Sequence, residues 1–512
     1  MPTFSKPQSK VLFSRKPITL NMAGQRSGKS HMIGFKSGYY IKNFPRMRGM
    51  IAANTYKQLS QSTLVAVRKV WKQEFGITEY DTRRDPKGVY VVNKKPPAHF
   101  KVYEEYDRYD GIISFRNGAI VYIASLDNYD AHDGKELGWA ELDETKDTKE
   151  QALTAVILGR MSQPGLYINP DGELVYSDDL QTPFESFNPV CINTSPAVGV
   201  VEWLVDMFNL NAYDEEILEK ITKKDDFFYK ENDNKAICIY STFHNEHNLP
   251  RNYISNRLKT LTKGDALKFV YGYPFTQSGG EFYDEFDRLK QVKKVQFRPF
   301  KPVHLTFDFN VMPYMTMLCS QIETVTMHAD ELNNLYNDPS DITRPVSVTK
   351  VRFFKEYCLK SPLNSVTGVV EAFRTDYGDK VNTVFYYGDA SGKNRVAGLG
   401  EYRVFDDVEK ELQGFIYPGS DRTMRRNPSV LKRRKFLQEI FKGGIHFIII
   451  EIDPIGCPEL IKDFQHLKLG KDGKLKEIVK VAETKATYEK YGHTSDACEY
   501  QVCSMFEDIF KS

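Results

Sequence analysis

The chain has 512 residues, of which 41% are hydrophobic and 27% charged, and its net charge is +2. This length predicts two or three domains with ample core, and the near-neutral charge means that any nucleic-acid surface must be local. Seven scattered cysteines without a CxxC pair exclude a disulfide framework and suit a reducing cytoplasm. No apolar run approaches the length of a membrane span, so we expect no membrane partner.

The first predicted element is an apolar strand that runs into a turn ending in Gly-Lys-Ser. Residues 18–30 read Ile-Thr-Leu-Asn-Met-Ala-Gly-Gln-Arg-Ser-Gly-Lys-Ser. Such a turn before a helix points backbone N–H groups at a polyphosphate; Lys29 would reach the β- and γ-phosphates of ATP, and Ser30 would bind Mg²⁺. A chance tripeptide in a loop is the alternative, which this context disfavours. The predicted nucleotide loop also contains Gly24, Gln25, Arg26, Ser27 and Gly28.

The next segments alternate between strand and helix signals. A short apolar strand is predicted at 49–55, a helix at 58–74 and a hairpin at 112–124 with an Asn117-Gly118 turn. This alternation indicates an α/β domain with a mainly parallel sheet and helices on its faces.

A second nucleotide signal is the apolar stretch Leu137–Leu142 that ends in Asp143 and Glu144. This pattern puts a carboxylate at the sheet edge beside the phosphate loop. Asp143 would hold Mg²⁺, largely through water, and Glu144 would polarise the attacking water. A surface acid pair is the alternative, which the presence of Lys29 makes less favoured.

Arg160 and Arg26 are candidates for sensing the γ-phosphate or for acting on a neighbouring subunit as an arginine finger. A solvated arginine is the alternative for each. The segment 190–196 is a further apolar strand that ends in Asn193, Thr194 and Ser195. Next to the phosphate site such a strand end would relay hydrolysis to a moving part, whereas the alternative is an ordinary strand followed by a turn.

Three acids stand out in the second half of the chain. Asp308 interrupts the apolar strand 303–309, Asp389 ends the strand 383–389, and Asp496 lies where a C-terminal helix starts. A charge within an apolar strand is costly unless it is paired or metal-bound. This order matches a ribonuclease-H-like sheet, in which three such acids converge and hold two Mg²⁺ or Mn²⁺ ions for phosphodiester hydrolysis. Helix capping is the alternative for Asp496.

The densest basic run of the chain lies at residues 422–435, between the second and third of these acids. Contacts with DNA phosphates would account for it, and so would a solvated helix face. The candidate DNA-binding residues are Arg425, Arg426, Arg433 and Arg434.

Taken together, these motifs resemble the large terminase subunit of tailed bacteriophages. The resemblance covers nearly the whole chain and includes Asn193-Thr-Ser-Pro196, Ser241–Pro250 and the three acids. It implies an ASCE-type P-loop ATPase domain over 1–242, a linker subdomain over 243–299 and a ribonuclease-H-like nuclease domain over 300–512. Ala23 departs from the loop's usual leading glycine, and Gln25 stands where the family's loop arginine falls. Residues 323–348 look like an insertion.

The resemblance also implies a mechanism and partners. ATP hydrolysis would pass through Asn193, Thr194 and Ser195 to the linker and the nuclease domain. The chain would act on double-stranded DNA with a small terminase subunit, as a pentameric ring on the portal protein of the procapsid, and would be a monomer in solution. It would work in the cytoplasm of the infected bacterium and would not enter the mature virion.

Two other classes of protein remain open on the sequence alone. One is a DNA helicase or remodelling ATPase whose C-terminal domain binds nucleic acid without cutting it. The other is a metal-dependent nuclease whose P-loop domain serves as a switch. The three acids argue against the first class, and Glu144 argues against the second.

Overall fold

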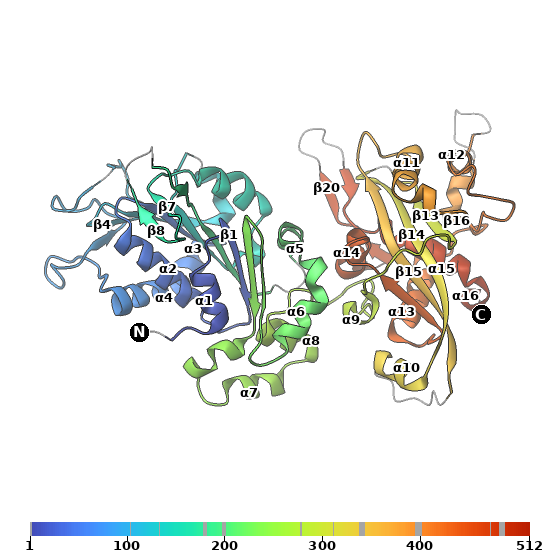
Figure 1. Cartoon of the computed structure of the whole chain (residues 1–512), viewed down its shortest axis with the longest axis horizontal. Helices are drawn as coiled ribbons and strands as arrows, with labels where there is room; N and C mark the ends of the chain where they lie inside the picture. The colour runs from blue at the N-terminus through green and yellow to red at the C-terminus, as the bar shows by residue number, and fades with distance from the viewer. Residues whose placement is uncertain are drawn as a thin grey trace. The chain divides into compact units, whose positions relative to one another are not determined.

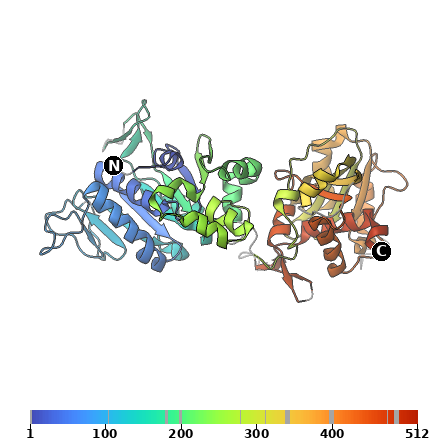
Figure 2. The same cartoon turned by 90° about the horizontal axis from the view of Figure 1, so that it is seen from below.

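The computed structural model divides the chain into two compact units, Met1–Thr276 and Gln277–Ser512. It describes all residues except 1–2, 103, 133, 178–181, 197–200, 277–278, 311, 337–343, 395–401, 472, 481–486 and 512. Each unit contains a β-sheet covered by helices (Figures 1 and 2). The boundary between the units falls inside 243–299, the segment predicted as a linker subdomain.

The first unit is built on a nine-stranded sheet in the order β11-β12-β1-β10-β6-β2-β5-β4-β3. The six strands from β12 to β5 are parallel, and antiparallel strands flank them on both sides. The bounds are β1 (Ile18–Ala23), β2 (Arg48–Ala53), β3 (Tyr90–Val92), β4 (Ile112–Phe115), β5 (Ile120–Ser125), β6 (Trp139–Asp143), β10 (Val190–Thr194), β11 (Phe228–Glu231) and β12 (Lys235–Tyr240). The predicted mainly parallel sheet is thus confirmed.

The central strands are mostly apolar and almost entirely buried, as expected for parallel strands covered on both faces. In register, Met22 of β1 pairs with Thr194 of β10, and Asn193 pairs with Asp143 of β6. The carboxyl ends of β1, β6 and β10 therefore meet at one sheet edge, where ligands of open α/β sheets bind. A small second sheet has the order β8-β7-β9, from β7 (Leu166–Ile168), β8 (Leu174–Tyr176) and β9 (Glu185–Ser186).

The helices of this unit cover both faces of the large sheet. A continuous helical stretch from Tyr56 to Phe75 confirms the helix predicted at 58–74, and its Trp71 packs edge-on against Tyr90 and Phe115. The α-helices are α1 (Lys6–Leu12), α2 (Lys29–Asn43), α3 (Tyr56–Gln58), α4 (Leu64–Val70), α5 (Glu202–Phe208), α6 (Asp214–Ile221), α7 (Tyr253–Thr260) and α8 (Lys263–Ala266). The predicted hairpin is also present, as β4 and β5 joined through Asn117-Gly118.

The second unit is built on a five-stranded sheet in the order β16-β13-β14-β15-β17. Strands β13, β14 and β15 form an antiparallel meander, and β16 and β17 add to its two edges in parallel. The bounds are β13 (Val303–Asp308), β14 (Met315–Met327), β15 (Val346–Leu359), β16 (Val384–Gly388) and β17 (Ile448–Ile452). Two small hairpins follow, β18 (Lys468–Gly470) with β19 (Gly473–Leu475) and β20 (Ile478–Lys480) with β21 (Thr487–Glu489).

Alternate residues of these strands point into two separate cores, one on each face of the sheet. Leu318 packs with α13, α14 and α15, whereas Phe307 and Met317 pack with α11 and α12. The helices are α9 (Arg288–Gln291), α10 (Ala329–Tyr336), α11 (Val366–Tyr377), α12 (Val404–Glu411), α13 (Val430–Lys442), α14 (Pro458–His466), α15 (His493–Met505) and α16 (Glu507–Lys511).

The predicted insertion at 323–348 is an extension of the β14–β15 hairpin. Pairing continues from Glu323 with Lys350 to Met327 with Val346, and α10 follows β14 at the far end of the hairpin (Figure 1). Leu332 and Tyr336 of α10 pack on Val348 and Ile449, so the extension has a small core of its own. Residues 337–343 of the insertion lie outside the described residues.

In the part of the chain that the structure describes, no helix is both long and apolar enough to cross a membrane. All seven cysteines are free thiols, and six of them are buried, in keeping with the prediction that they serve as small apolar groups.

Candidate active sites

The turn between β1 and α2 has the backbone that a phosphate-binding loop needs. Gly28 precedes α2 with φ 91°, a left-handed conformation that glycine adopts without strain. Gly24 lies against the backbone of Val270, where a Cβ atom would collide with the carbonyl oxygen. Both glycines are therefore required by the geometry of the turn. Ala23, in place of the expected leading glycine, is the last residue of β1 and is fully buried.

Three successive carbonyl groups of the loop each accept a hydrogen bond from a side chain outside it. The bonds run from Thr242 Oγ1 to Gln25 O (2.7 Å), from Asn245 Nδ2 to Arg26 O (2.7 Å) and from Gln8 Nε2 to Ser27 O (2.9 Å). Carbonyls held from outside leave the N–H side of the turn to face an anion. These donors could not be predicted individually because they come from α1 and from the segment after β12, although Ser241–Pro250 contributed to the family resemblance.

Lys29 lies at the centre of this site and is buried. Its Nζ donates to Ser195 Oγ at 2.8 Å and lies 3.2 Å from the carbonyl oxygens of both Ala23 and Gly24. Burial lowers the pKa of Lys29, and the nearby carboxylates of Glu144 and Asp143 oppose that shift. The structure thus brings the predicted loop lysine, the acid pair and the end of β10 together.

Asp143, the last residue of β6, is buried beside the loop and accepts a hydrogen bond of 2.5 Å from Thr63 Oγ1. Burial raises the pKa of Asp143 to about 6, against the stabilising bond from Thr63. A buried carboxylate held by one hydroxyl is suited to a cation. Ser30, the other predicted Mg²⁺ ligand, is in the first turn of α2.

Glu144 follows with φ 48° and ψ 47°, a left-handed conformation that non-glycine residues seldom adopt and that is typical of functional sites. Its Oε1 accepts from Ser195 Oγ at 3.5 Å, and its Oε2 lies 3.2 Å from Lys146 Nζ. Ser195 therefore connects the loop lysine to the predicted catalytic glutamate.

The two predicted arginines are placed differently. The Arg160 carbonyl accepts from the N–H of Leu137, just before β6 begins, so Arg160 is at the opposite end of this strand from Asp143. The six residue steps from Leu137 to Asp143 span about 20 Å, so Arg160 lies away from the nucleotide site of its own chain and does not sense the γ-phosphate there. Its predicted action on a neighbouring subunit as an arginine finger stays a prediction. The side chain of Arg26 is exposed at the loop, where φ is 60°.

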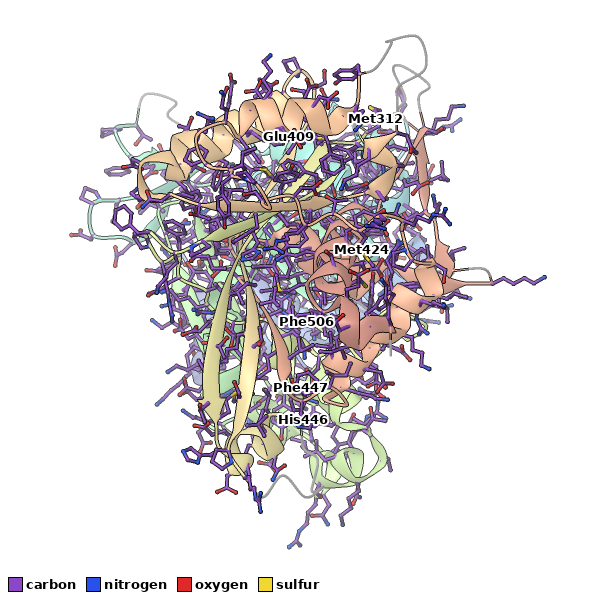
Figure 3. All side chains as sticks on the ribbon, turned by 90° about the vertical axis from the view of Figure 1, so that its right-hand side faces the viewer. Met312, Glu409, Met424, His446, Phe447 and Phe506 are labelled. Atoms are coloured by element: carbon purple, nitrogen blue, oxygen red, sulfur yellow. The ribbon has the colours of Figure 1, made fainter. Side chains whose placement is uncertain are left out.

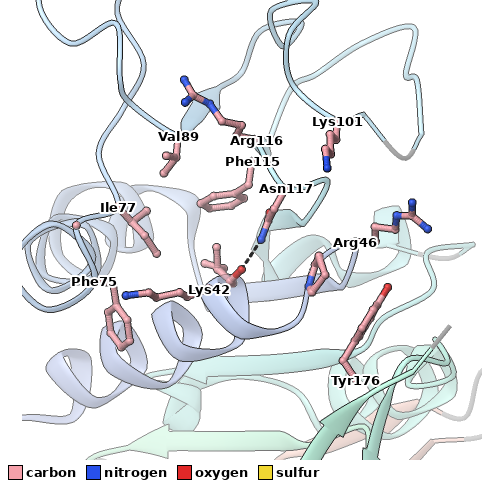
Figure 4. A pocket seen from close by; sticks show the side chains of 13 residues that line it. Lys42, Arg46, Phe75, Ile77, Val89, Lys101, Phe115, Arg116, Asn117 and Tyr176 are labelled. Atoms are coloured by element: carbon pink, nitrogen blue, oxygen red, sulfur yellow. Dashed lines mark hydrogen bonds between the residues drawn. The ribbon is translucent and has the colours of Figure 1, made fainter.

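A cavity of about 610 Å³ lies elsewhere in this unit, near the C-terminal end of α2 (Figure 4). Asn117 donates to the carbonyl of Ile41 at 2.7 Å beside it. Its lining includes Lys42, Arg46, Lys101 and Arg116 together with Phe75, Phe115 and Tyr176. No residue of the loop lines this cavity, so it is separate from the predicted nucleotide site.

In the second unit, two of the predicted acids end neighbouring parallel strands. Phe307 of β13 pairs with Gly388 of β16, so Asp308 and Asp389 follow at the same end of the sheet. In Figure 3, Met312, which comes shortly after β13, lies at the opposite end of the unit from His446 and Phe447, which precede β17.

Helix α15 brings the third acid to this end. Thr306 Oγ1 of β13 donates to the Ala497 carbonyl at 2.9 Å, which fixes α15 on the sheet next to Asp496. Tyr500, one turn further, donates to Asp389 Oδ2 at 3.4 Å. Burial raises the pKa of Tyr500, and the charges of Asp496, Asp389 and Asp308 raise it further, as expected if all three acids surround this hydroxyl.

Asp308 is buried and pairs with a histidine that was not among the predicted site residues. His493 Nδ1 lies 3.1 Å from Asp308 Oδ2, which also accepts from Asn310 at 3.0 Å. Burial raises the pKa of Asp308. Burial lowers the pKa of His493, but its bond with Asp308 outweighs that effect and raises the pKa to about 9. His493 thus supplies positive charge to this carboxylate.

Asp496 is held by two buried cations. Its Oδ1 lies 2.6 Å from Arg433 Nη2 and 3.0 Å from Lys474 Nζ. Burial opposes ionisation, yet Lys474 and Arg433 hold the pKa of Asp496 below its usual value. Helix capping does not explain this residue, because α15 begins after Gly492 and its first N–H groups are bound by Asp463 of α14.

The basic run divides into buried and exposed arginines. Arg433 is buried between Asp496 and Glu499, so the prediction that it binds DNA is wrong. Arg434 pairs with Asp284 at 2.8 Å. Arg425 and Arg426 are exposed.

These two exposed arginines come immediately before Asn427, which binds the second predicted acid. Asn427 Nδ2 donates to Asp389 Oδ1 at 2.5 Å, and Asn427 Oδ1 accepts from the N–H of Ala390 at 2.9 Å. The bond fixes the arginine loop beside Asp389. Asn427 could not be predicted because the contact joins two loops that are distant in sequence.

The oxygen ligands of Asp308, Asp389 and Asp496 have the chemistry that Mg²⁺ and Mn²⁺ prefer. Within the described residues, however, no three histidine, cysteine or acidic side chains are placed to hold a metal ion together. Asp308 pairs with His493, and Asp496 pairs with Arg433 and Lys474. The donor set fits divalent ions, and binding would require these side chains to move.

No protein-family model and no curated protein matches this chain. Among solved structures, the large terminase of a thermophilic bacteriophage is similar over 98% of this chain and 99% of that chain, with 15% identity and a TM-score of 0.36. The HK97 bacteriophage large terminase is similar over 98% of this chain and 95% of that chain, with 10% identity and a TM-score of 0.35. The ATPase domain of a Thermus phage large terminase matches over 53% of this chain and 94% of its own, with 14% identity and a TM-score of 0.32.

Proposed function

We propose that this chain is an ATP-driven motor that moves double-stranded viral DNA into a procapsid and cuts concatemeric DNA. The observation that carries the proposal is the presence of two sites in one chain. The first unit holds Lys29, Asp143, Glu144 and Ser195 at the end of a parallel sheet. The second unit gathers Asp308, Asp389 and Asp496 at one end of a mixed sheet. This pairing is what the motifs of the large terminase family imply.

In the first site, the loop N–H groups and Lys29 bind the phosphates of ATP. Asp143 and Ser30 would hold the Mg²⁺ that accompanies the nucleotide. Glu144 accepts a proton from the attacking water, and its carboxylate lies 3.5 Å from the Ser195 hydroxyl to which Lys29 also donates. Because Ser195 touches both Lys29 and Glu144, a phosphate that competes for Lys29 shifts the end of β10.

In the second site, Asp308, Asp389 and Asp496 would hold two Mg²⁺ or Mn²⁺ ions, which polarise the phosphodiester and activate water. His493 orients Asp308, and Asn427 orients Asp389. Arg425 and Arg426 contact the DNA backbone next to the acids.

The resemblance supplies the partners of this motor: the portal protein of the procapsid, a small terminase subunit and further copies of the chain in a ring, which the family implies is pentameric. The segment 243–299 would connect the nucleotide site to the nuclease. Work of this kind takes place in the cytoplasm of the infected bacterium.

A packaging assay tests the proposal. The purified chain is mixed with portal-bearing procapsids, linear duplex DNA and ATP, and the DNA that resists added nuclease is measured. We expect protected DNA with the wild type and none with Lys29→Ala. A wild-type chain that hydrolyses ATP but protects no DNA in procapsids competent with another motor would contradict packaging and favour a remodelling ATPase.

A further inference from the structure

A second layer of polar side chains lies beneath the nucleotide site, on β1, α2, β6 and β10. Glu141 comes two residues before Asp143 on β6, and Asn193 of β10 comes two residues before Ser195, which directly follows that strand. Alternate strand residues share a face, so each of these lies below its partner in the site. Lys36 comes seven residues, or about two turns, after Lys29 on α2, which puts both lysines on one side of the helix.

These side chains form one connected network in the core. Lys36 Nζ lies 3.4 Å from Glu141 Oε1, and Asn193 Nδ2 donates to Glu141 Oε2 at 2.9 Å. Asn21 of β1 donates to Asn193 Oδ1 at 2.7 Å. Every member is at most 5% exposed. The network therefore joins the strand before the loop, the helix after it, the strand of the acid pair and the strand of Ser195.

An ion pair in this position is costly for a core. Removing two charges from water typically costs more than their attraction returns, and apolar residues of similar volume often stabilise a fold as well or better. A contribution to stability therefore does not readily explain why a buried ion pair stands at Lys36 and Glu141. Glu141 differs from an apolar side chain in accepting the Asn193 amide, and that bond fixes β10 against β6 two residues below Ser195.

We propose that Glu141, neutralised by Lys36, is a positioning residue that holds Asn193 and β10 so that Ser195 reaches both Lys29 and Glu144. This inference rests on the proposed ATPase function. The network acts on the turnover step and not on nucleotide binding, because its members lie below the loop and do not touch the phosphate site.

Two double variants separate positioning from stability. Lys36→Met with Glu141→Gln removes both charges but keeps an oxygen that accepts from Asn193. Lys36→Met with Glu141→Leu also removes both charges, at similar volume, and loses that acceptor. For each variant we would measure ATP turnover, the Kd of a fluorescent ADP analogue and the midpoint of thermal unfolding.

We expect the glutamine double variant to keep a kcat within about 2-fold of the wild type, and the leucine variant to lose about 10-fold, as for the loss of one aligned hydrogen bond. Both should bind the ADP analogue with wild-type affinity. Equal kcat values for two folded double variants would overturn the inference.

A second variant covers the case in which the leucine double variant does not fold. Asn193→Ala removes the donor from the other side of the same bond and should lower kcat by a similar factor with unchanged ADP affinity. A folded Asn193→Ala variant with wild-type kcat would also overturn the inference.

Two controls complete the design. Lys350→Met with Glu451→Gln removes an ion pair of 2.8 Å in the second unit, together with the pair of Glu451 and Arg352, and should leave ATP turnover unchanged. The failure of the proposed function looks different: in that case the wild type would not hydrolyse ATP, or Lys29→Ala would hydrolyse it as fast as the wild type.

Discussion

The ammonium group of Lys29 donates a hydrogen bond of 2.8 Å to the hydroxyl of Ser195, the residue that follows β10. The same hydroxyl lies 3.5 Å from Glu144. Residues that are 166 positions apart in sequence thus share one contact at the centre of the nucleotide site. In the ATPase that we propose, an incoming phosphate competes for the donors of Lys29, so we expect nucleotide binding and the position of Ser195 to be linked.

Ser195→Ala removes this link without removing either charge. We expect ATP turnover to fall about 10-fold, the effect of one hydrogen bond to a charged group, while ADP affinity stays within about 2-fold. Steady-state kinetics and titration of a fluorescent ADP analogue measure the two effects. Ser186→Ala, an exposed residue of β9, serves as the control. Unchanged ATP turnover in Ser195→Ala would show that the Ser195 hydroxyl has no role in hydrolysis.

Glu144→Gln keeps the size of the side chain but removes the base. Turnover should fall by at least about 100-fold, the usual contribution of a positioned base, and nucleotide binding should persist. The exposed Glu150→Gln, in the segment that follows, is expected to behave as the wild type. If Glu144→Gln retained more than a tenth of the wild-type turnover, the catalytic base would have to be sought elsewhere.

Arg425 and Arg426 are expected to contact DNA phosphates, because they are exposed and precede the Asn427 that binds Asp389. Replacing both by alanine should weaken duplex binding and lower the slope of log Kd against log salt by about 2, or about 1 for each lost contact. Fluorescence anisotropy over a salt series measures this slope. Alanine at the exposed Lys432 and Lys435 provides a matched charge change, and an equal effect there would mean that only net charge matters.

Glu356 of β15 predicts a pH dependence for the second unit. It is buried and accepts hydrogen bonds from the N–H groups of Glu459 and Leu460, at the start of α14. Burial raises its pKa to about 8. The pKa of a glutamate in the unfolded chain is about 4.3. Between this pKa and the native one, the native state binds more protons than the unfolded state, so the free energy of unfolding falls as pH rises from about 4.3 to about 8.

Glu356→Gln should flatten this dependence. Thermal unfolding midpoints between pH 5 and pH 8, followed by a probe in the second unit, would compare this variant with the wild type and with the exposed Glu285→Gln. Equal slopes in Glu356→Gln and the wild type would show that another group carries the dependence.

Local sequence patterns were sufficient to predict the elements that carry the two sites. A strand, a Gly-Lys-Ser turn and a helix are contiguous in sequence, so Lys29 and its surroundings could be predicted from spacing alone. Asp308 and Asp389 could be predicted as site residues because each interrupts or ends an apolar strand, where an unpaired charge is energetically costly.

Long-range contacts explain what the sequence did not reveal. Arg433 belongs to a basic run whose pattern predicts an exposed surface, but its ion pairs with Asp496 and Glu499 of α15 hold it in the core. Arg160 follows the acid pair closely in sequence, yet the chain turns back along β6 and carries it to the far end of that strand. The partners Gln8, Thr242 and Asn427 are ordinary polar residues, and only the tertiary structure identifies them.

The central claim is that one chain carries an ATPase site and a separate DNA-cutting site. The most direct test is a crossed measurement of ATP turnover and of supercoiled-plasmid cutting in Mn²⁺ for the wild type, Lys29→Ala and Asp308→Asn. We expect Lys29→Ala to lose turnover and keep cutting, and Asp308→Asn to lose cutting and keep turnover. Two results would contradict the account. One is a folded wild-type chain that hydrolyses ATP but does not cut, and the other is an Asp308→Asn variant that cuts as well as the wild type.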